Sequence, residues 1–474
     1  MIFSTPVFFA FFVVYFGLHF AIPVRHRLWL IIVGSTFFYA WWKLDYLWIP
    51  FVLMGIAYFG GRWIGGEQDQ GARGRRTGLM IVVLLIPLFI FKYTDFVYRD
   101  VFGPFFGIRD GLLNLSLPLG ISFISFTLTA YLVDIYRDAF TSKRPPKTVL
   151  AYVLFFPHLI AGPILRPYEL IPQLEQPRAA TLRRFSLPLA IFTLGLVKKL
   201  VFADQLSPIV TATYAQDATV SALDASLAII GFAVQVYCDF SGYTDMAIGL
   251  AAMLGIRLPN NFRQPYTATS ISGLWRRWHM TLTRFLSDYV YLPVSMNLAR
   301  FAVRRRLGKW PMFLFTVVIP VNVTFLVSGI WHGAGWNFIV FGIFTGVAMS
   351  VEFCWRRARM PPLPRALAWL LTILAFLISL CFFRAHSPGK AIDMMAASVA
   401  GSWSGIETFF AQNVFVIFLI VVFAACHRFD DHRLVKLAVR RVRAEFVWAT
   451  ILFGWVLAIT VSQGSSGAFV YFDF

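Results

Sequence analysis

A histidine, His332, lies between two long apolar segments in the last third of the sequence, within the stretch Val-Ser-Gly-Ile-Trp-His-Gly-Ala-Gly-Trp at 327–336. Ionisable side chains are costly inside a bilayer and mark functional sites when they occur there. A neutral imidazole can take a proton from a hydroxyl group near neutral pH and return it later, as general acid–base catalysis requires. His332 is therefore the first candidate for a catalytic base, and a hydrogen-bonded structural histidine is the alternative.

Small and polar residues surround this histidine in the sequence. Asn322, Thr324 and Ser328 precede it and would present hydrogen-bonding groups from the same helix. Gly333 and Gly335 follow it and predict space for a ligand beside the ring. The pattern predicts a cavity with Asn322 in its lining.

A second group of candidates is a run of consecutive aromatic and basic residues: Trp275, Arg276, Arg277, Trp278 and His279. The surrounding stretch 257–309 contains ten Lys or Arg and one acidic residue. Guanidinium groups bind phosphates through paired hydrogen bonds and stack on flat rings, so the run could bind the pyrophosphate and adenine of a nucleotide-type thioester donor. The alternative is an interfacial helix that binds anionic lipid headgroups, with the two tryptophans at the membrane surface.

The longest polar stretch inside an apolar segment is 238–246, and it leads into Pro-Asn-Asn-Phe at 259–262. Its carboxylates need water, a basic partner or a cavity, because lipid satisfies none of them. We expect a polar cavity at membrane depth that is lined by four of these side chains: Asp239, Ser241, Tyr243 and Asp245. In the alternative, the two aspartates pair with nearby arginines and only stabilise the fold.

No metal site is predicted, because the other histidines are scattered and form no pair at helical spacing. His26, His427 and His432 lie among loop charges and are expected to be solvated. The four cysteines lack C-x-x-C spacing and are expected to be buried free thiols: Cys238, Cys354, Cys381 and Cys426.

The composition indicates which elements must position these residues. The chain is 58% hydrophobic and 14% charged, whereas soluble domains are about 45–50% apolar. It is predicted to be an all-α polytopic membrane protein with roughly 11 to 12 transmembrane helices, plus re-entrant or interfacial helices. The expected crossings are 8–22, 28–42, 47–59, 78–91, 117–133, 187–201, 222–236, 312–330, 337–353, 366–383, 414–426 and 446–461.

One membrane domain, 1–474, is the simplest organisation, because no repeat of fixed period occurs. Within it we expect N-terminal helices at 1–110, a catalytic core at 111–355 and C-terminal helices at 356–474. Segments 156–184 and 257–309 are interrupted by Pro, Gly and Arg, so they are the candidates for re-entrant structure.

The net charge of +19 is placed in short connections between apolar segments, which is typical of cytoplasmic loops and gives no reason to expect nucleic-acid binding. This pattern predicts that the N-terminus lies outside. The first apolar run lacks a basic start and a cleavage site, so it is expected to be a retained helix.

Taken together, these blocks resemble the membrane-bound O-acyltransferase family, in the bacterial polysaccharide branch typified by the alginate O-acetyltransferase membrane subunit. The matching stretches are in family order and span most of the chain: 117–137, 155–164, 195–199, 239–247, 275–279, 331–334, 382–385 and 470–474. Pro157 is followed by His158 where the family often has Gln, and we expect a hydrogen-bonded structural role for this histidine.

The resemblance implies a helical bundle around a central cavity, which acetyl-CoA enters from the cytoplasm as a substrate and not as a bound cofactor. It implies that His332 activates the accepting hydroxyl and that His279 is the second histidine of the site. The other implied roles are donor binding by Trp275, Arg276, Arg277 and Trp278, and cavity shaping by Asp239, Tyr243 and Asp245.

The resemblance also implies a location in the bacterial inner membrane, in contact with its lipids. It implies a periplasmic acetyltransferase or esterase-like protein as the partner, and an exopolysaccharide such as alginate as the acceptor. The long outward loop expected at 385–413 is a candidate docking surface for that partner.

Two other functions stay open at this point. Within the family, the chain could transfer D-alanyl or another acyl group from a carrier protein to a cell-wall polymer. In a different class, it could be a channel or transporter, since intramembrane Asp and His residues also serve proton relays. Transporters usually contain matching inverted halves, and none is visible in this sequence.

Overall fold

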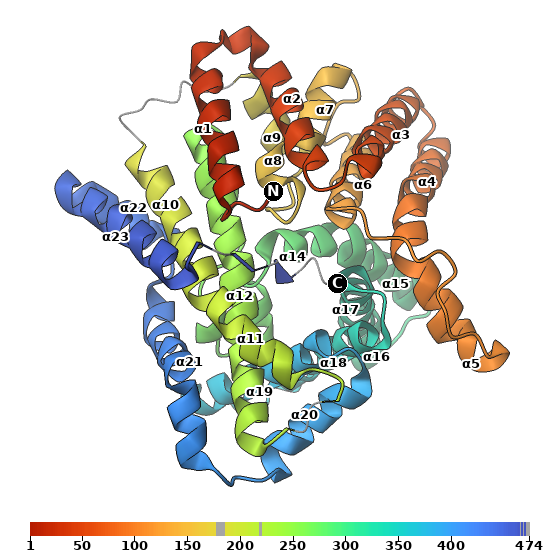
Figure 1. The fold of residues 1–474 in the computed structure, drawn as a ribbon. Coiled ribbons are helices and arrows are strands. Elements are labelled where there is room, and N and C mark those ends of the chain that lie inside the picture. The colour runs from red at the N-terminus through yellow and green to blue at the C-terminus, as the bar shows by residue number, and fades with distance from the viewer. Residues whose placement is uncertain (177–184, 218–219, 465, 468, 471–474) are drawn as a thin grey trace. The chain divides into compact units, whose positions relative to one another are not determined.

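The computed structural model describes residues 1–176, 185–217, 220–464, 466–467 and 469–470. In these ranges the chain forms helices and loops without a β-strand (Figure 1). The prediction of an all-α protein is thus confirmed.

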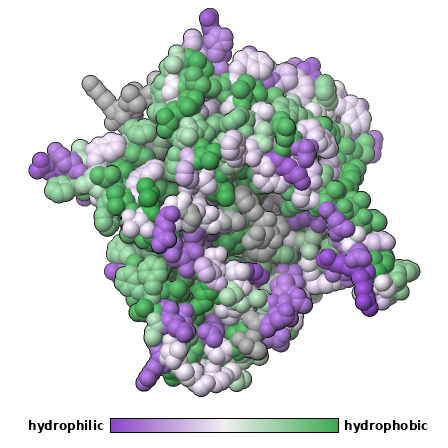
Figure 2. Space-filling model, in the orientation of Figure 1, coloured by the Kyte–Doolittle hydropathy of each residue, from purple (hydrophilic) through white to green (hydrophobic). Residues whose placement is uncertain are grey.

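Nine helices in the described ranges are long and apolar enough to cross a membrane, and two shorter apolar helices, α1 (Pro6–Ala21) and α6 (Ile121–Tyr136), accompany them. The long ones are Leu44–Gly65, Gln70–Phe106, Ser186–Thr213, Ala222–Met253, Lys309–His332, Trp336–Arg357, Arg365–Arg384, Ile406–Phe429 and Ala444–Ser462. Hydrophobic side chains, green in Figure 2, cover much of the face shown there, as helices in contact with lipid require. The chain is a multi-pass membrane protein.

Close contacts divide the described chain into two compact units, each built from separate stretches of sequence. The first contains the described residues of Met1–Leu196, Tyr243–Asn260 and Val439–Phe472, and the second contains Val197–Gly242 and Asn261–Ala438. Helix α12 (Ala222–Met253) contributes to both units. The predicted subdivision at residues 110 and 355 stays a prediction about domain organisation.

The helices of the first unit are mostly long and apolar, with short helices between them. They are α1, α2 (Arg27–Ala40), α3 (Trp48–Gly65), α4 (Gln70–Phe96), α5 (Gly103–Phe106), α6, α7 (Pro146–Leu154), α8 (Phe156–Leu159), α9 (Pro167–Glu175), α10 (Ser186–Val197) and α23 (Ala444–Ser462). Helices α3, α4 and α6 pack against one another.

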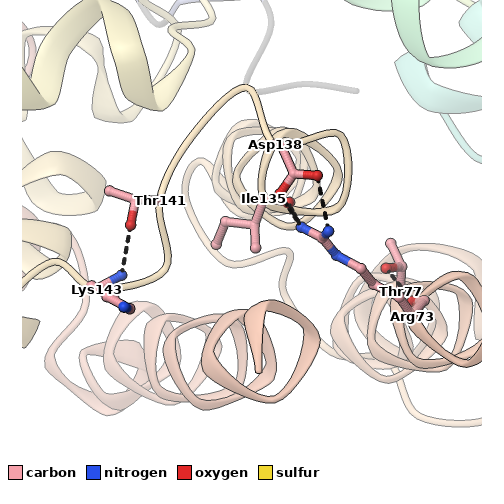
Figure 3. A network of polar contacts seen from close by, with 6 residues as sticks. All are labelled: Arg73, Thr77, Ile135, Asp138, Thr141 and Lys143. Atoms are coloured by element: carbon pink, nitrogen blue, oxygen red, sulfur yellow. Dashed lines mark hydrogen bonds and ion pairs between the residues drawn. The ribbon is translucent and has the colours of Figure 1, made fainter. Parts of the chain in front are cut away.

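A buried arginine links α4 to the end of α6. Arg73 donates from Nη2 to the carbonyl of Ile135 at 2.5 Å and to Asp138 Oδ1 at 2.6 Å, and from Nη1 to Asp138 Oδ2 at 2.9 Å (Figure 3). The last carbonyls of a helix have no partner inside the helix, so a guanidinium group stabilises this end. The same guanidinium holds the pKa of the Asp138 carboxyl below its usual range.

The second unit contains the remaining helices. They are α11 (Asp204–Thr213), α13 (Ile271–Trp275), α14 (Met280–Leu286), α15 (Leu292–Arg304), α16 (Lys309–Phe313), α17 (Ile319–His332), α18 (Trp336–Arg357), α19 (Arg365–Arg384), α20 (Pro388–Ala400) and α21 (Ile406–Cys426), with α22 (His432–Arg441) at its boundary. Among the helices that the structure describes, α17 and α18 make the most extensive contact with each other. A Cβ atom on Gly342 would lie 2.5 Å from the carbonyl oxygen of Phe325, so glycine is required for this approach.

The two interrupted segments form short helices, and their re-entry into the membrane stays a prediction. Segment 156–184 contains α8 and α9, and its last residues, 177–184, lie outside the described ranges. Segment 257–309 contains α13, α14, α15 and the π-helical turn η7 (Ser287–Tyr291). The expected loop at 385–413 is largely helical instead, because Ser387 caps α20 by accepting from Lys390 N–H at 3.2 Å and Pro388 favours its first turn.

Candidate functional site

A cavity of about 190 Å³ lies in the second unit, and both predicted histidines, His279 and His332, line it. Helices α13, α14, α17 and α18, the turn η7 and the residues between α13 and α14 form its walls. The lining is mostly apolar, with hydroxyl groups at Ser272, Thr283, Ser287, Tyr291, Thr324 and Ser328. The sequence placed these histidines more than 50 residues apart, and the fold brings them to one cavity.

Helix α17 positions His332 together with two hydroxyl groups. Thr324, Ser328 and His332 are spaced by four residues, so they share one face of the helix, and all three line the cavity. Asn322 lies on another face. Its amide donates to the carbonyl of Val318 at 2.9 Å and to Ser350 Oγ at 2.7 Å, which connects α17 to α18. The structure therefore places Asn322 outside the described lining of this cavity.

Aromatic rings surround the imidazole of His332. The ring centroids of Trp331, Phe383 and Phe341 lie 4.8, 5.1 and 5.8 Å from that of His332. The residue is 6% exposed, and its ring reaches the cavity. A reacting group held beside it would be shielded from bulk water, which strengthens electrostatic interactions there.

The glycines after His332 do not provide the predicted ligand space. A Cβ atom on Gly333 would overlap the ring of Phe338, and one on Gly335 would overlap the amide oxygen of Asn337. Side chains at the start of α18 already fill this volume. The prediction was wrong because sequence spacing does not show which neighbour occupies the space beside a glycine.

The run of aromatic and basic residues divides between the cavity and its surroundings. Trp275, Arg276, Trp278 and His279 line the cavity. Arg277 is not part of the lining, and its Nη1 donates to Thr267 Oγ1 at 2.7 Å. Arg276 is exposed to solvent, so a cation is available at the mouth of the cavity.

His279 is held in a buried and specific position. It adopts a left-handed backbone conformation with φ of 41°, and its Nδ1 lies 3.2 Å from Asn261 Oδ1. The ring also packs edge-on against Phe240, with centroids 4.6 Å apart. Burial lowers the pKa of His279 to about 3, so the imidazole is neutral at physiological pH.

Asp239 is part of a buried ion-pair cluster. Lys199, in the π-helical segment η5 (Lys198–Ala203), places its Nζ 2.7 Å from Asp239 Oδ1 and 2.8 Å from Asp204 Oδ1. The sequence led us to consider arginine partners, and the partner of Asp239 is a lysine. Neither Asp239 nor the fully buried Ser241 belongs to the described lining of the cavity around the histidines.

Tyr243 and Asp245 fall in the first unit, on the later part of α12. Tyr243 packs between two phenylalanines, with its ring centroid 4.6 Å from that of Phe3 and 4.9 Å from that of Phe469. Asp245 is 4% exposed. The prediction that these two residues line a polar cavity stays a prediction.

Three smaller groups of residues can also be compared with their predictions. His158 Nε2 lies 2.8 Å from the carbonyl of Tyr152, which is a hydrogen-bonded structural position. His427 is not solvated as expected: it is 5% exposed and accepts from Tyr266 N–H at 3.2 Å. The four cysteines form no disulfide; Cys238 and Cys381 are buried as expected, whereas Cys354 is half-buried and Cys426 is exposed, so the expected burial was wrong for these two.

Sequence reasoning missed two features of the site. The hydroxyls of Ser272 and Tyr291 line the cavity although neither residue was singled out. Asn261, part of the Pro-Asn-Asn-Phe stretch, was noticed without its partner His279. Their types gave a weak signal, because hydroxyl and amide groups occur in many positions without lining a site.

Comparison with known proteins places this site in a family. The sequence profile of MBOAT, the membrane-bound O-acyltransferase family, matches residues 135–387, a range that includes both histidines. A probable alginate O-acetylase of Azotobacter vinelandii is 36% identical over 412 residues, which cover 85% of this chain and 79% of that protein. A peptidoglycan O-acetyltransferase of Helicobacter pylori is 34% identical over 437 residues, covering 84% and 80%.

A more distant relative is the teichoic acid D-alanyltransferase of Bacillus subtilis, 27% identical over 276 residues, which cover 57% of this chain and 66% of that protein. The chain belongs to the membrane-bound O-acyltransferase family.

Proposed function

We propose that this O-acyltransferase moves an acetyl group from cytoplasmic acetyl-CoA to an extracytoplasmic polysaccharide such as alginate, through a periplasmic acetyltransferase or esterase-like partner. The observation that carries this proposal is the cavity with both His279 and His332 in its lining. The acetylating relatives, whose names specify alginate and peptidoglycan, support a polymer acceptor.

In the proposed reaction His332 accepts the proton of the acceptor hydroxyl as its oxygen attacks the thioester carbonyl. The C–S bond then breaks, and the departing thiolate takes up the proton that His332 had accepted, which returns the imidazole to its neutral form. The hydroxyl group of Ser328 lies on the same face of α17 and lines the same cavity, where it can donate a hydrogen bond to the developing oxyanion. The Thr324 hydroxyl donates to the carbonyl of Pro320 at 2.6 Å, so in the cavity it serves as an acceptor.

The size of the cavity favours a small acyl group. Sites for drug-sized ligands occupy about 300–1,000 Å³. At about 190 Å³ the cavity suits the acetyl thioester end of the donor and not the whole molecule. Arg276, at the exposed side of the lining, is then placed to bind the phosphates that stay outside.

The proposal includes a location and an orientation. The protein lies in the bacterial inner membrane with its basic connections in the cytoplasm and its N-terminus outside, because cytoplasmic loops carry the excess of Lys and Arg. The donor side of the cavity then faces the cytoplasm.

The test uses the full chain in proteoliposomes that are supplied with labelled acetyl-CoA, with and without a periplasmic extract. Transfer of label to protein or polymer, with release of free CoA thiol, is expected for the wild type. His332→Ala should abolish transfer and keep the native elution profile and thermal midpoint. The matched control is His26→Ala, since His26 is exposed and is not among the residues that line the cavity.

Transfer by His332→Ala at the rate of the control would contradict the proposed base. Labelled D-alanyl carrier protein is the competing donor to be tested in the same vesicles. If it alone supports transfer, the acetyl-CoA part of the proposal fails.

A further inference from the structure

Asn261 makes contacts with His279 that determine which ring nitrogen carries the proton. Asn261 Oδ1 lies 3.2 Å from His279 Nδ1 and 3.0 Å from the backbone nitrogen of Thr281. A backbone N–H can only donate, so the atom that it meets is the amide oxygen and not the amide nitrogen. An oxygen of this kind can only accept, and the proton between it and the imidazole therefore belongs to Nδ1.

The same residue fixes the backbone on which this ring sits. Met280 N–H donates to the carbonyl of Asn261 at 2.8 Å, and Thr281 Oγ1 donates to Asn261 Oδ1 at 2.9 Å. These bonds satisfy donors at the start of α14, next to the left-handed backbone of His279. Non-glycine residues adopt that conformation only where the surroundings enforce it.

We propose that Asn261 is a positioning residue that holds the cavity-lining His279 as the neutral tautomer with its proton on Nδ1, so that Nε2 is the proton-accepting nitrogen. This inference rests on the proposed acyl transfer, in which His279 is the second histidine of the site. A neutral amide is suited to this task, because a carboxylate in its place would stabilise the imidazolium form.

The elements packed around His279 carry several charged and titratable groups. Burial is the cause of its lowered pKa. Charged and titratable groups are carried by each element around it: Arg276, Arg277 and Arg284 on its own segment, Asp288 and Tyr291 on η7, Asp239 beside Phe240 on α12, and His332 on α17. Asp239 is paired with Lys199 and Arg277 with Thr267, so neither replaces Asn261 as the partner of Nδ1.

Two substitutions of similar size separate positioning from simple packing. Asn261→Asp keeps an oxygen that accepts from Nδ1 and from Thr281, and adds a charge. Asn261→Leu keeps the volume and removes the acceptor. Asn297→Asp is the control, because Asn297 is exposed on α15.

We expect Asn261→Leu to lower kcat about 10²-fold, with a much smaller change in KM for acetyl-CoA, since a positioned acid or base contributes about 10²–10⁴-fold. Asn261→Asp should keep most of the activity at neutral pH and lose it in acid, at a higher pH than the wild type does, because an adjacent carboxylate raises the pKa of an imidazole. Asn297→Asp should follow the wild type at every pH.

Nitrogen-15 NMR of histidine-labelled protein gives a readout that a structural role would not change. The signal of His279, identified by its loss in His279→Gln, should show a protonated Nδ1 and an unprotonated Nε2 in the wild type. Asn261→Asp should show the doubly protonated ring at a higher pH than the wild type does.

A wild-type ring with its proton on Nε2 would overturn the inference, as would wild-type kcat in a folded Asn261→Leu protein. If the wild type transfers no acetyl group from any donor, the proposed function fails, and the NMR result still decides the tautomer. If the Asn261 variants do not fold, the wild-type spectrum decides the inference by itself.

Discussion

The ion-pair cluster around Lys199 predicts a large and specific loss of stability when its cation is removed. Lys199 Nζ is within 2.8 Å of carboxylate oxygens of both Asp204 and Asp239. The side chains of Lys199 and Asp239 are 2% and 1% exposed, so water does not readily replace the ammonium group. Lys199→Met keeps the length of the side chain and leaves two carboxylates without their shared cation.

The structure gives the size of the effect. At an effective dielectric constant of about 20, unit charges 2.7 Å apart attract by about 6 kcal/mol. Part of that attraction offsets the cost of removing the ions from water. Removing one partner of a buried pair therefore lowers the free energy of unfolding by about 3–5 kcal/mol. An exposed pair contributes only about 0–1 kcal/mol.

The assay is the free energy of unfolding in lipid bicelles, measured by steric trapping. The control is Lys143→Met, which changes the same residue type at an exposed position. A double variant, Lys199→Met with Asp239→Asn, removes one of the uncompensated charges and should be more stable than Lys199→Met alone. A loss in Lys199→Met no larger than that of Lys143→Met would refute the reasoning.

The same variants decide what Asp239 does. If it only stabilises the fold, acyl transfer by the double variant recovers in proportion to its folded fraction. If Asp239 also shapes the donor path, transfer stays low after stability has returned.

Three further predictions concern other contacts. Gly342→Ala should lower the free energy of unfolding by about 1–3 kcal/mol and slow acyl transfer, because its Cβ would press α18 against the Phe325 carbonyl of α17. The control Gly55→Ala has open space around the new methyl group and should change neither stability nor transfer. Equal thermal midpoints for the two variants would contradict this prediction. The Arg73 contact holds the pKa of Asp138 below its usual range, so the stability that it contributes is present at neutral pH and is lost as the pH falls through that lowered pKa. The thermal midpoints of the wild type and Asp138→Asn should converge in acid. A difference that does not change with pH would show that the Arg73–Asp138 contact does not contribute this stability. Ser272→Ala removes a hydroxyl that donates to Glu352 at 2.6 Å and should lower the unfolding free energy by about 1.5–3 kcal/mol; an unchanged value would show that this contact is not formed in the membrane.

Local patterns in the sequence determined the helices and the polar face of α17. Apolar runs of sufficient length predict membrane crossings wherever they occur, because the backbone of a lipid-exposed segment must satisfy its own hydrogen bonds. The four-residue spacing of Thr324, Ser328 and His332 is enough to place them on one face. The same rule, applied to Asn322, would have assigned it to a different face.

The tertiary structure decided which distant groups meet. Nothing in the sequence specifies that Lys199 pairs with Asp239, that Phe338 fills the space beside Gly333, or that Asn261 accepts from His279. Periodicity is a property of neighbouring residues along one helix, whereas these contacts depend on how side chains from separate segments fit together. The sequence therefore identifies His279 and His332 as candidate site residues, whereas the packing of α13, α14, α17 and α18 forms the cavity that both of them line.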